Sequence, residues 1–259
     1  MRNWSLVFAL GLFASPLFGQ SETLDDIRLF QTFFQDAAVS NHPYGEGIFG
    51  FSDFDAANVI NLGVRGAYPI NPQFEIGGSL AFVNADPDAG SGESGISDLR
   101  ITGRYHLAMD QPTQVTVGGF ITLPIGNDDL GQGETNFGAF GAVRHPLAPN
   151  TVLTGTISLE FLEGAPLRNG GWPGIIIAST DKETAILLGG GIIHKTSGQI
   201  SLVGELNLVT EGDFAMLSGG LDYELRSGGR LRATLGLGLD DGAPDLSLVF
   251  GFQHSFDRY

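Results

Sequence analysis

The chain has 259 residues, among them 39 glycines, 19 phenylalanines and no cysteine, and its formal net charge is −16. The 13 lysines and arginines are too few for a protein that binds nucleic acid, which needs a clustered basic surface. The lack of cysteine excludes a disulfide framework, a thiol nucleophile and a cysteine-ligated metal site. So much glycine disfavours a helical bundle, and the apolar content disfavours disorder, so we expect one folded domain.

The first 20 residues have the pattern of a secretory signal peptide. Arg2 precedes an apolar run over residues 4–14, Pro16 ends that run, and small or polar residues follow at 19–21. The alternative is a membrane-anchoring helix, but the run is shorter than the ~20 residues that a span requires. We therefore predict a removed leader over residues 1–20. No later stretch has ~18 continuous apolar residues, so the mature chain would cross a membrane only as strands.

Residues 21–45 form a separate N-terminal segment before the first predicted strand. Between Asp25 and Ala37 this segment is rich in apolar and aromatic residues, including Phe30, Phe33 and Phe34. Such a segment is suited to plug a barrel, to precede it in the periplasm or to add a strand. The sequence leaves these three alternatives open.

From residue 46 to residue 259, short segments alternate apolar and polar residues, and glycine-rich or acidic residues separate them. Successive side chains of a strand point to opposite faces, so each segment has one apolar and one polar side. A train of such segments is typical of a transmembrane antiparallel β-barrel. We predict an all-β barrel of about 12 strands, with a range of 10 to 14. The twelve segments run at about 46–54, 60–68, 74–82, 99–107, 114–123, 136–144, 153–161, 185–195, 200–208, 217–225, 231–239 and 246–256.

The connections between these segments alternate in length and charge. Every second connection is short and low in acid, as at 69–73 and 226–230, and the intervening ones carry most of the length and acid. This segregation predicts periplasmic turns at one end of the barrel and external loops at the other. The longest connection, 162–184, contains Trp172 in an apolar run. We expect it either to fold inward as a constriction or to extend as a hairpin above the membrane.

The polar phase of the strands carries charges of both signs. A soluble β-sandwich also alternates faces, but its outward face should carry many lysines and glutamates, whereas the polar phase here is thin. Isolated buried ions are costly, so these side chains must pair or face water, and both outcomes predict a polar lumen. The candidate lumen and permeation residues are Arg65, Glu75, Asp98, Arg100, Arg104, Arg144, Glu160, Glu205, Asp222, Glu224 and Arg232.

Three stretches suggest a family. They are GISDLRITGRY at 95–105, VGGFITLPIGN at 117–127 and TNFGAF at 135–140. They resemble the outer-membrane barrel family labelled "MetA-pathway of phenol degradation", whose members are also described as transporters, and the likeness extends from about Leu62 to Phe161. The resemblance implies a Gram-negative outer-membrane barrel that passes small, aromatic compounds. It carries over no binding residue.

The expected function is therefore a passive channel that passes or binds a small aromatic or hydrophobic molecule. We expect the barrel to contact outer-membrane lipid and lipopolysaccharide after insertion by the barrel assembly machinery, and we predict no cofactor, metal site or catalytic residue. One alternative is a structural or adhesive barrel whose acidic loops bridge cations. Another is a lipid-modifying enzyme, but its His-x-Ser pair on one strand does not occur in this sequence.

Overall fold

The computed structural model describes residues 22–108, 112–127, 130, 134–162, 168–169, 176–177, 183–196, 198–226 and 228–256. The predicted leader therefore lies outside the described residues. Two short helical segments, α1 (Glu22–Asp25) and η1 (Phe33–Gln35), precede the strands. The strands are β1 (Tyr44–Phe54), β2 (Ala57–Pro69), β3 (Phe74–Pro87), β4 (Glu93–Ile96), β5 (Leu99–Ala108), β6 (Gln114–Leu123), β7 (Asn136–Ala148), β8 (Thr151–Leu162), β9 (Arg168–Asn169), β10 (Ile176–Ile177), β11 (Glu183–Lys195), β12 (Ile200–Val209), β13 (Phe214–Glu224), β14 (Gly229–Gly238) and β15 (Leu246–Ser255).

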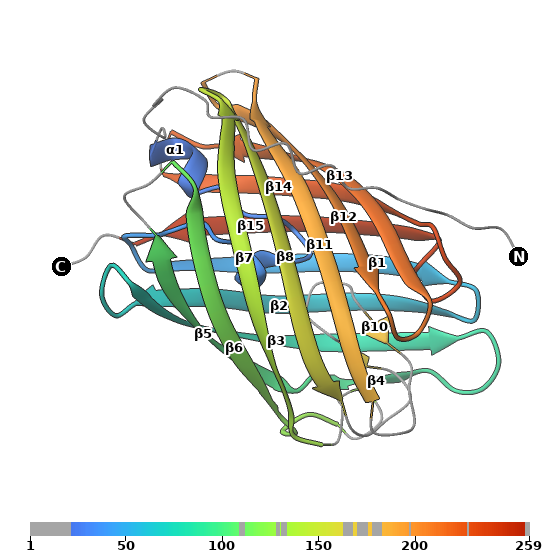
Figure 1. Cartoon of the computed structure of the whole chain (residues 1–259). Helices are drawn as coiled ribbons and strands as arrows, with labels where there is room; N and C mark the ends of the chain where they lie inside the picture. The colour runs from blue at the N-terminus through green and yellow to red at the C-terminus, as the bar shows by residue number, and fades with distance from the viewer. Residues whose placement is uncertain are drawn as a thin grey trace, which may run out of the picture.

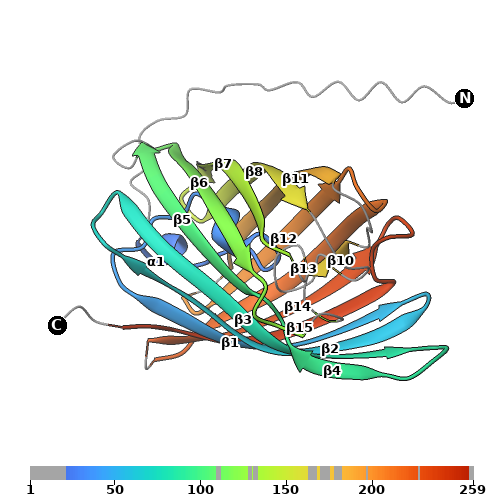
Figure 2. The same cartoon turned by 90° about the horizontal axis from the view of Figure 1, so that it is seen from below.

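Antiparallel pairing of these strands closes a barrel (Figures 1 and 2). Each long strand pairs with its neighbour in the chain, β1 pairs with β15, and β2 pairs with β3. The short β4 and β5 both pair with β3, but the register shifts by one residue between Phe82↔Ile96 and Ser79↔Arg100. A one-residue shift is typical of a β-bulge, so β4 and β5 together form one position of the wall. Within the described residues the wall has twelve positions, and the predicted fold class is confirmed.

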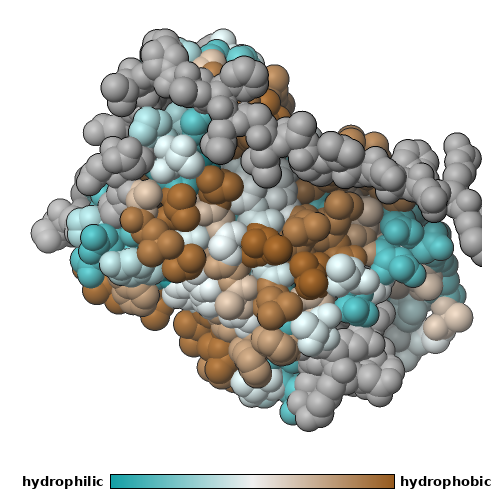
Figure 3. All heavy atoms as spheres, viewed as in Figure 1, coloured by the Kyte–Doolittle hydropathy of each residue, from teal (hydrophilic) through white to brown (hydrophobic). Residues whose placement is uncertain are grey.

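The two faces of the wall differ as the alternation predicts. On β2, Leu62 and Val64 are 62% and 63% exposed, whereas Asn61 and Arg65 on either side of them are both 3% exposed. The other long strands repeat this pattern, and apolar residues cover much of the outer surface in Figure 3. An apolar exterior around a polar interior suits a wall that faces hydrocarbon. Among the described residues, no helix has the length and apolar content to cross a membrane.

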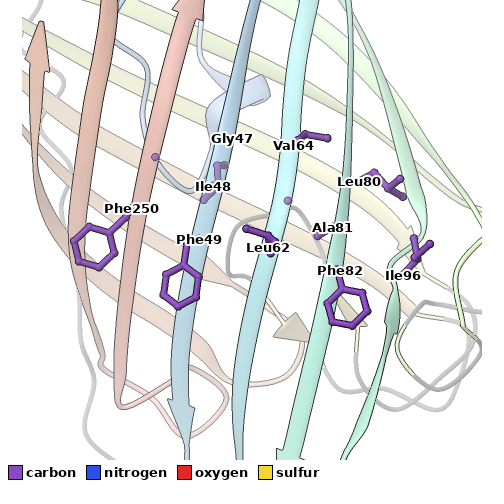
Figure 4. Close-up of a pocket in the computed structure, with 12 residues that line it drawn as sticks. Gly47, Ile48, Phe49, Leu62, Val64, Leu80, Ala81, Phe82, Ile96 and Phe250 are labelled. Carbon is purple, nitrogen blue, oxygen red and sulfur yellow. The ribbon is translucent and has the colours of Figure 1, made fainter. Parts of the chain in front are cut away.

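The outer face also has an apolar groove of about 810 Å³ over β15 and β1 to β4. Gly47 has open space where a side chain would stand, and Phe49, Leu62, Phe82 and Phe250 line the groove around it (Figure 4). These side chains belong to the outward phase of their strands. The groove is therefore part of the apolar exterior and separate from the lumen.

The two ends of the barrel differ in their connections. At one end, called the turn end here, the strands are joined at 70–73, 109–113, 149–150, 196–199 and 225–228. At the other, the loop end, most connections are longer, although Asp55 and Ala56 alone join β1 to β2. Within the long connection after β8, the two-residue strands β9 and β10 pair with each other. Trp172 lies outside the described residues.

Residues 22–43, called the plug segment here, enter the barrel, and residues 24–40 lie mostly buried inside it (Figure 2). Leu24, Ile27, Leu29 and Phe30 pack against inward side chains of β8, β11 and β12. The segment starts and finishes at the turn end, where the Gln253 amide donates to the Asp26 carbonyl and the Phe256 N–H donates to the Pro43 carbonyl. Between these points it reaches Glu160 on β8 through Gln35. It is therefore a loop that enters and leaves the lumen by the same mouth.

Candidate functional site in the barrel lumen

Five charged side chains of the wall form a continuous buried group on β2, β1, β14 and β13, with β15 between β1 and β14. Arg65 Nε donates to Glu46 Oε2 at 2.7 Å, and Arg232 Nη1 donates to Glu46 Oε1 at 2.9 Å. Asp222 accepts from Arg232 Nε at 3.1 Å and from Arg230 Nε at 2.6 Å. Each acid thus lies between two guanidinium groups. The charged partners all belong to β1, β2, β13 and β14, so these ion pairs lie within the wall, and the plug segment adds backbone acceptors, the Phe30 carbonyl for Arg65 at 2.9 Å and the Arg28 carbonyl for Arg232.

Two further ion pairs involve Arg104 and Arg100, which both lie on β5. Arg104 binds the Glu75 carboxylate, which also accepts from the Tyr44 hydroxyl at 2.8 Å. Arg100 Nη2 lies 3.5 Å from Glu160 Oε1, and the Arg100 guanidinium stands 3.5 Å from the centre of the Phe120 ring. These wall charges also keep an oppositely charged partner on the barrel itself.

Arg144 on β7 is compensated differently, because its described partners all belong to the plug segment. Its Nη1 donates to Asp36 Oδ2 at 3.0 Å and to the Ile27 carbonyl at 3.1 Å, and its Nη2 donates to the Leu24 carbonyl. Its Nε lies 3.8 Å from Asp25 Oδ1. Arg144 is 0% exposed, so its charge depends on the plug segment for compensation.

Glu205 on β12 depends on the plug segment in the same way. Its carboxylate accepts from three consecutive backbone N–H groups, those of Phe30 at 2.8 Å, Gln31 at 3.1 Å and Thr32 at 2.9 Å. The Thr32 hydroxyl adds a bond of 3.0 Å, and the wall contributes the Asn207 amide at 3.4 Å. Hydrogen bonds to an ionised group are each worth about 1.5–3 kcal/mol, so Glu205 is a major anchor of the segment.

The aromatic rings of the plug segment lie against guanidinium groups. Arg65 stands 3.7 Å from the centre of the Phe33 ring, with Arg28 at 5.9 Å and Arg232 at 5.7 Å. Arg232 also stands 4.5 Å from the centre of the Phe30 ring. Such desolvated cation–π contacts contribute roughly 2 kcal/mol each. Phe33 therefore joins the plug segment to the charged group of the wall.

Glycines of the wall provide the space for side chains of the plug segment. A Cβ added at Gly77 would lie 2.7 Å from the Phe34 ring, one at Gly220 2.7 Å from the Phe30 ring, and one at Gly191 2.5 Å from Leu29. Distances this short are below the contact distance that packing tolerates, so a larger residue would displace the segment or distort the wall. The wall and the segment therefore fit each other closely.

The acids of the plug segment differ in how easily they ionise. Burial raises the pKa of Asp25 and of Asp26, and nearby arginines only partly offset it. Burial also disfavours the charged form of Asp36, but the guanidinium groups of Arg144 and Arg28 outweigh it, so the pKa of Asp36 is lowered. Asp36 is therefore the ionised partner that holds Arg144.

The structure places the predicted lumen candidates on the inward phase but distributes them over separate groups. Asp98 accepts from the Gly126 N–H at 3.0 Å beside the break between β4 and β5. Glu224 lies at the turn end, 4.0 Å from Lys195 and 3.8 Å from Arg230, and is partly exposed. The other candidates form the groups described above, and Phe30, Phe33 and Phe34 are buried in the lumen.

Sequence reasoning missed five charged residues of the site. Glu46 is the third residue of β1 and is in phase with buried Ser52, so the alternation of that strand contained the signal. Arg230 stands at the border of a predicted turn. Asp25, Arg28 and Asp36 lie in the plug segment, which has no strand periodicity to show which side chains point toward the wall.

Near the loop end, the lumen contains two apolar clusters, which the predicted set of charged lumen residues did not indicate. Inward side chains of β1, β2, β3 and β15 form one apolar cluster, which includes Ile48, Val59, Val83 and Val249. A second apolar cluster on β11 to β13 includes Leu187, Phe214 and Met216. The larger charged group thus lies toward the turn end, whereas the loop end combines these two apolar clusters with the Arg100–Glu160 ion pair.

Solved structures of outer-membrane proteins share this fold. The COG4313 outer membrane channel from Pseudomonas putida F1 superposes with a TM-score of 0.68 at 14% identity, over 86% of this chain and 98% of that one. The KdgM porin matches with a TM-score of 0.56 at 10% identity, over 82% and 99% of the two chains. The NanC porin matches with a TM-score of 0.55 at 8% identity, over 83% and 100%.

The architecture and these comparisons define the fold as a closed antiparallel barrel, which the solved outer-membrane channel and porins also have. No protein-family model matches the sequence, and no curated protein matches it. Identity this low shows the fold alone. The resemblance to the phenol-degradation family therefore stays a prediction.

Proposed function

We propose that the protein is an outer-membrane channel that passes a small molecule passively, and that the plug segment closes it in the state described here. The observation that carries the proposal is that the plug segment fills the lumen. A charged and hydrogen-bonded wall surrounds a loop that enters and leaves by one mouth, without pairing as a strand of the wall. Such a loop can withdraw without threading through the barrel.

The location and the solute belong to the same proposal. The apolar exterior favours insertion in lipid, and the channels and porins that share the fold support an outer-membrane location after removal of the leader. The two apolar clusters near the loop end of the lumen favour a solute with an aromatic or hydrophobic part. The lining charges would orient its polar groups during diffusion.

Planar-bilayer recording of the purified full-length protein tests this function. We expect small conductance steps with a low open fraction, because the plug segment is buried and bound. The variant Phe33→Ala, which removes the ring between Arg65 and Arg28, should raise the open fraction. Absence of conductance from both proteins would contradict the channel function, provided that the heat-modified gel mobility of each shows that it is folded.

The chain has no cysteine, so one introduced thiol reports on the plug segment without background. Gln31 is 4% exposed, and its side-chain amide has no hydrogen-bond partner within the described residues, so Gln31→Cys should cost little. A water-soluble maleimide should label this thiol, called the reporter thiol here, slowly in the closed state. The labelling rate should rise with Phe33→Ala.

A further inference from the structure

The contacts of Arg144 and Glu205 indicate what the open lumen would bind. When the plug segment withdraws, the other wall charges described above keep a partner on the barrel, but Arg144 loses both acids and Glu205 loses the three N–H groups. The open lumen would then present Arg144 without an acidic partner, and Glu205 with the Asn207 amide as its remaining described donor, in the field of the wall residues Arg65 and Arg232. A solute that accepts hydrogen bonds from Arg144 and donates hydrogen bonds to Glu205 would replace the contacts of the plug segment.

The wall has a site formed for a carboxylate at Arg144. The two oxygens of Asp36 accept from Arg144 Nη1 and from the Thr154 hydroxyl, each at 3.0 Å, and Asp36 is 0% exposed. The neighbouring Arg104 donates to the Asp36 backbone carbonyl at 2.8 Å. Arg144, Thr154 and Arg104 all belong to the barrel and would remain in place for a carboxylate from another molecule.

The second half of the site is Glu205, which accepts hydrogen bonds from the N–H groups of a peptide-like ligand. Recesses for side chains lie beside it. The N–H groups that Glu205 binds belong to residues whose neighbouring side chains enter the wall at glycines, Leu29 at Gly191 and Phe30 at Gly220. Arg232 covers the Phe30 ring at 4.5 Å. An aromatic or aliphatic side chain therefore fits these recesses in the same way.

We propose that the open lumen binds an amino acid or short peptide with an aromatic or aliphatic side chain, and that the plug segment occupies this site when the channel is closed. The ligand carboxylate lies at Arg144 and Thr154, its amino or amide N–H groups lie at Glu205, and its side chain lies at Gly191 or Gly220. Between the Ile27 carbonyl that Arg144 binds and the Phe30 N–H that Glu205 binds, the plug segment has two whole residues, which span at most about 7 Å. This length suits a dipeptide or tripeptide.

The proposal rests on the proposed channel function, because only an open lumen admits the ligand. Two readouts separate the failure of one from the failure of the other. The probe is the dipeptide Leu-Phe with free termini, and its control is the same dipeptide with acetylated and amidated ends. Current is recorded through the Phe33→Ala protein, and the labelling rate of the reporter thiol is measured in a Gln31→Cys protein that is otherwise unchanged.

The free dipeptide should block the current and should raise the labelling rate of the reporter thiol by displacing the plug segment, whereas the blocked dipeptide should do neither. In the Phe33→Ala background, Glu205→Gln should weaken the block by about tenfold, which corresponds to the loss of one charged partner. Glu160→Gln is the control, because Glu160 is a buried carboxylate outside the proposed site, and its ion-pair partner Arg100 belongs to the wall. Its contact with Gln35 is lost once the plug segment withdraws, so this variant should leave the block unchanged.

Equal effects of the free and blocked dipeptides, or equal weakening by Glu205→Gln and Glu160→Gln, would overturn the proposed site. Conductance without any response to the dipeptide would overturn the site and leave the channel intact. Absence of conductance together with faster labelling of the reporter thiol by the free dipeptide would support the site and reject the channel.

Discussion

Arg232 and Arg144 are both buried guanidinium groups of the barrel wall, at 2% and 0% exposure, but they are compensated by different parts of the molecule. Arg232 is bound by Glu46 and Asp222, which other strands of the wall supply. Arg144 is bound by Asp25 and Asp36, which the plug segment supplies. The first arrangement belongs to the barrel in any state. The second belongs only to the closed state. The position of the partner therefore distinguishes the frame, which is the barrel wall, from the gate, which is the plug segment.

The largest effect should come from breaking the frame. Asp222→Ala leaves Arg230 without its 2.6 Å partner and Arg232 with Glu46 alone. Removing one member of a buried ion group costs roughly 3–5 kcal/mol, so the barrel should unfold at a clearly lower temperature. Loss of the heat-modified band on a gel measures this. An unchanged unfolding temperature would mean that the wall group contributes little to the frame.

Phe33→Ala should act on the gate by a similar amount but leave the frame intact. Truncation of a buried phenylalanine costs roughly 3–5 kcal/mol, and here the cost falls on docking of the plug segment. The open fraction in bilayers should rise, while the unfolding temperature of the barrel stays close to that of the unmodified protein. A fall in unfolding temperature as large as that of Asp222→Ala would remove the distinction between frame and gate.

A smaller effect is expected from closing one of the recesses. Gly77→Ala places a methyl group against the Phe34 ring, and overpacking of this kind costs roughly 1–3 kcal/mol. Faster labelling of the reporter thiol measures the displaced plug segment. The double variant Gly77→Ala with Phe34→Ala should recover part of the protection, because the truncated side chain leaves room for the methyl group. Absence of any recovery would place the strain in the wall.

The smallest effect is expected at the turn end. Glu224 is partly exposed and lies 3.8 Å or more from its cationic neighbours, so Glu224→Gln should change stability by about 1 kcal/mol or less. Its unfolding temperature and the labelling rate of its reporter thiol should both match those of the protein without this change. A large change in either would show that charges at the mouth take part in the gate.

The wall could be predicted from the sequence because strand alternation is local. The exposed Leu62 and Val64 and the buried Asn61 and Arg65 lie within five consecutive residues, so their opposite faces follow from backbone geometry. The same reasoning placed Arg144 and Glu205 in the lumen. Their partners could not be predicted, because Arg144 meets Asp36 across 108 positions of the chain and Glu205 meets Phe30 across 175.

The plug segment shows the same limit from the other side. Its aromatic residues indicated a buried role, but a loop without periodicity does not specify which wall receives it. Only the glycines at 77, 191 and 220, placed opposite Phe34, Leu29 and Phe30, show that the wall is shaped for this segment. In the sequence those glycines are indistinguishable from glycines that merely bend a strand.

The central claim is that withdrawal of the plug segment opens the lumen, and simultaneous measurement of reporter-thiol labelling and bilayer conductance tests it most directly. Across Gln31→Cys proteins that also carry Phe33→Ala, Gly77→Ala or Glu224→Gln, labelling rate and open fraction should rise together in the order Glu224→Gln, Gly77→Ala, Phe33→Ala. Fast labelling without conductance, or conductance while the reporter thiol stays protected, would contradict the account.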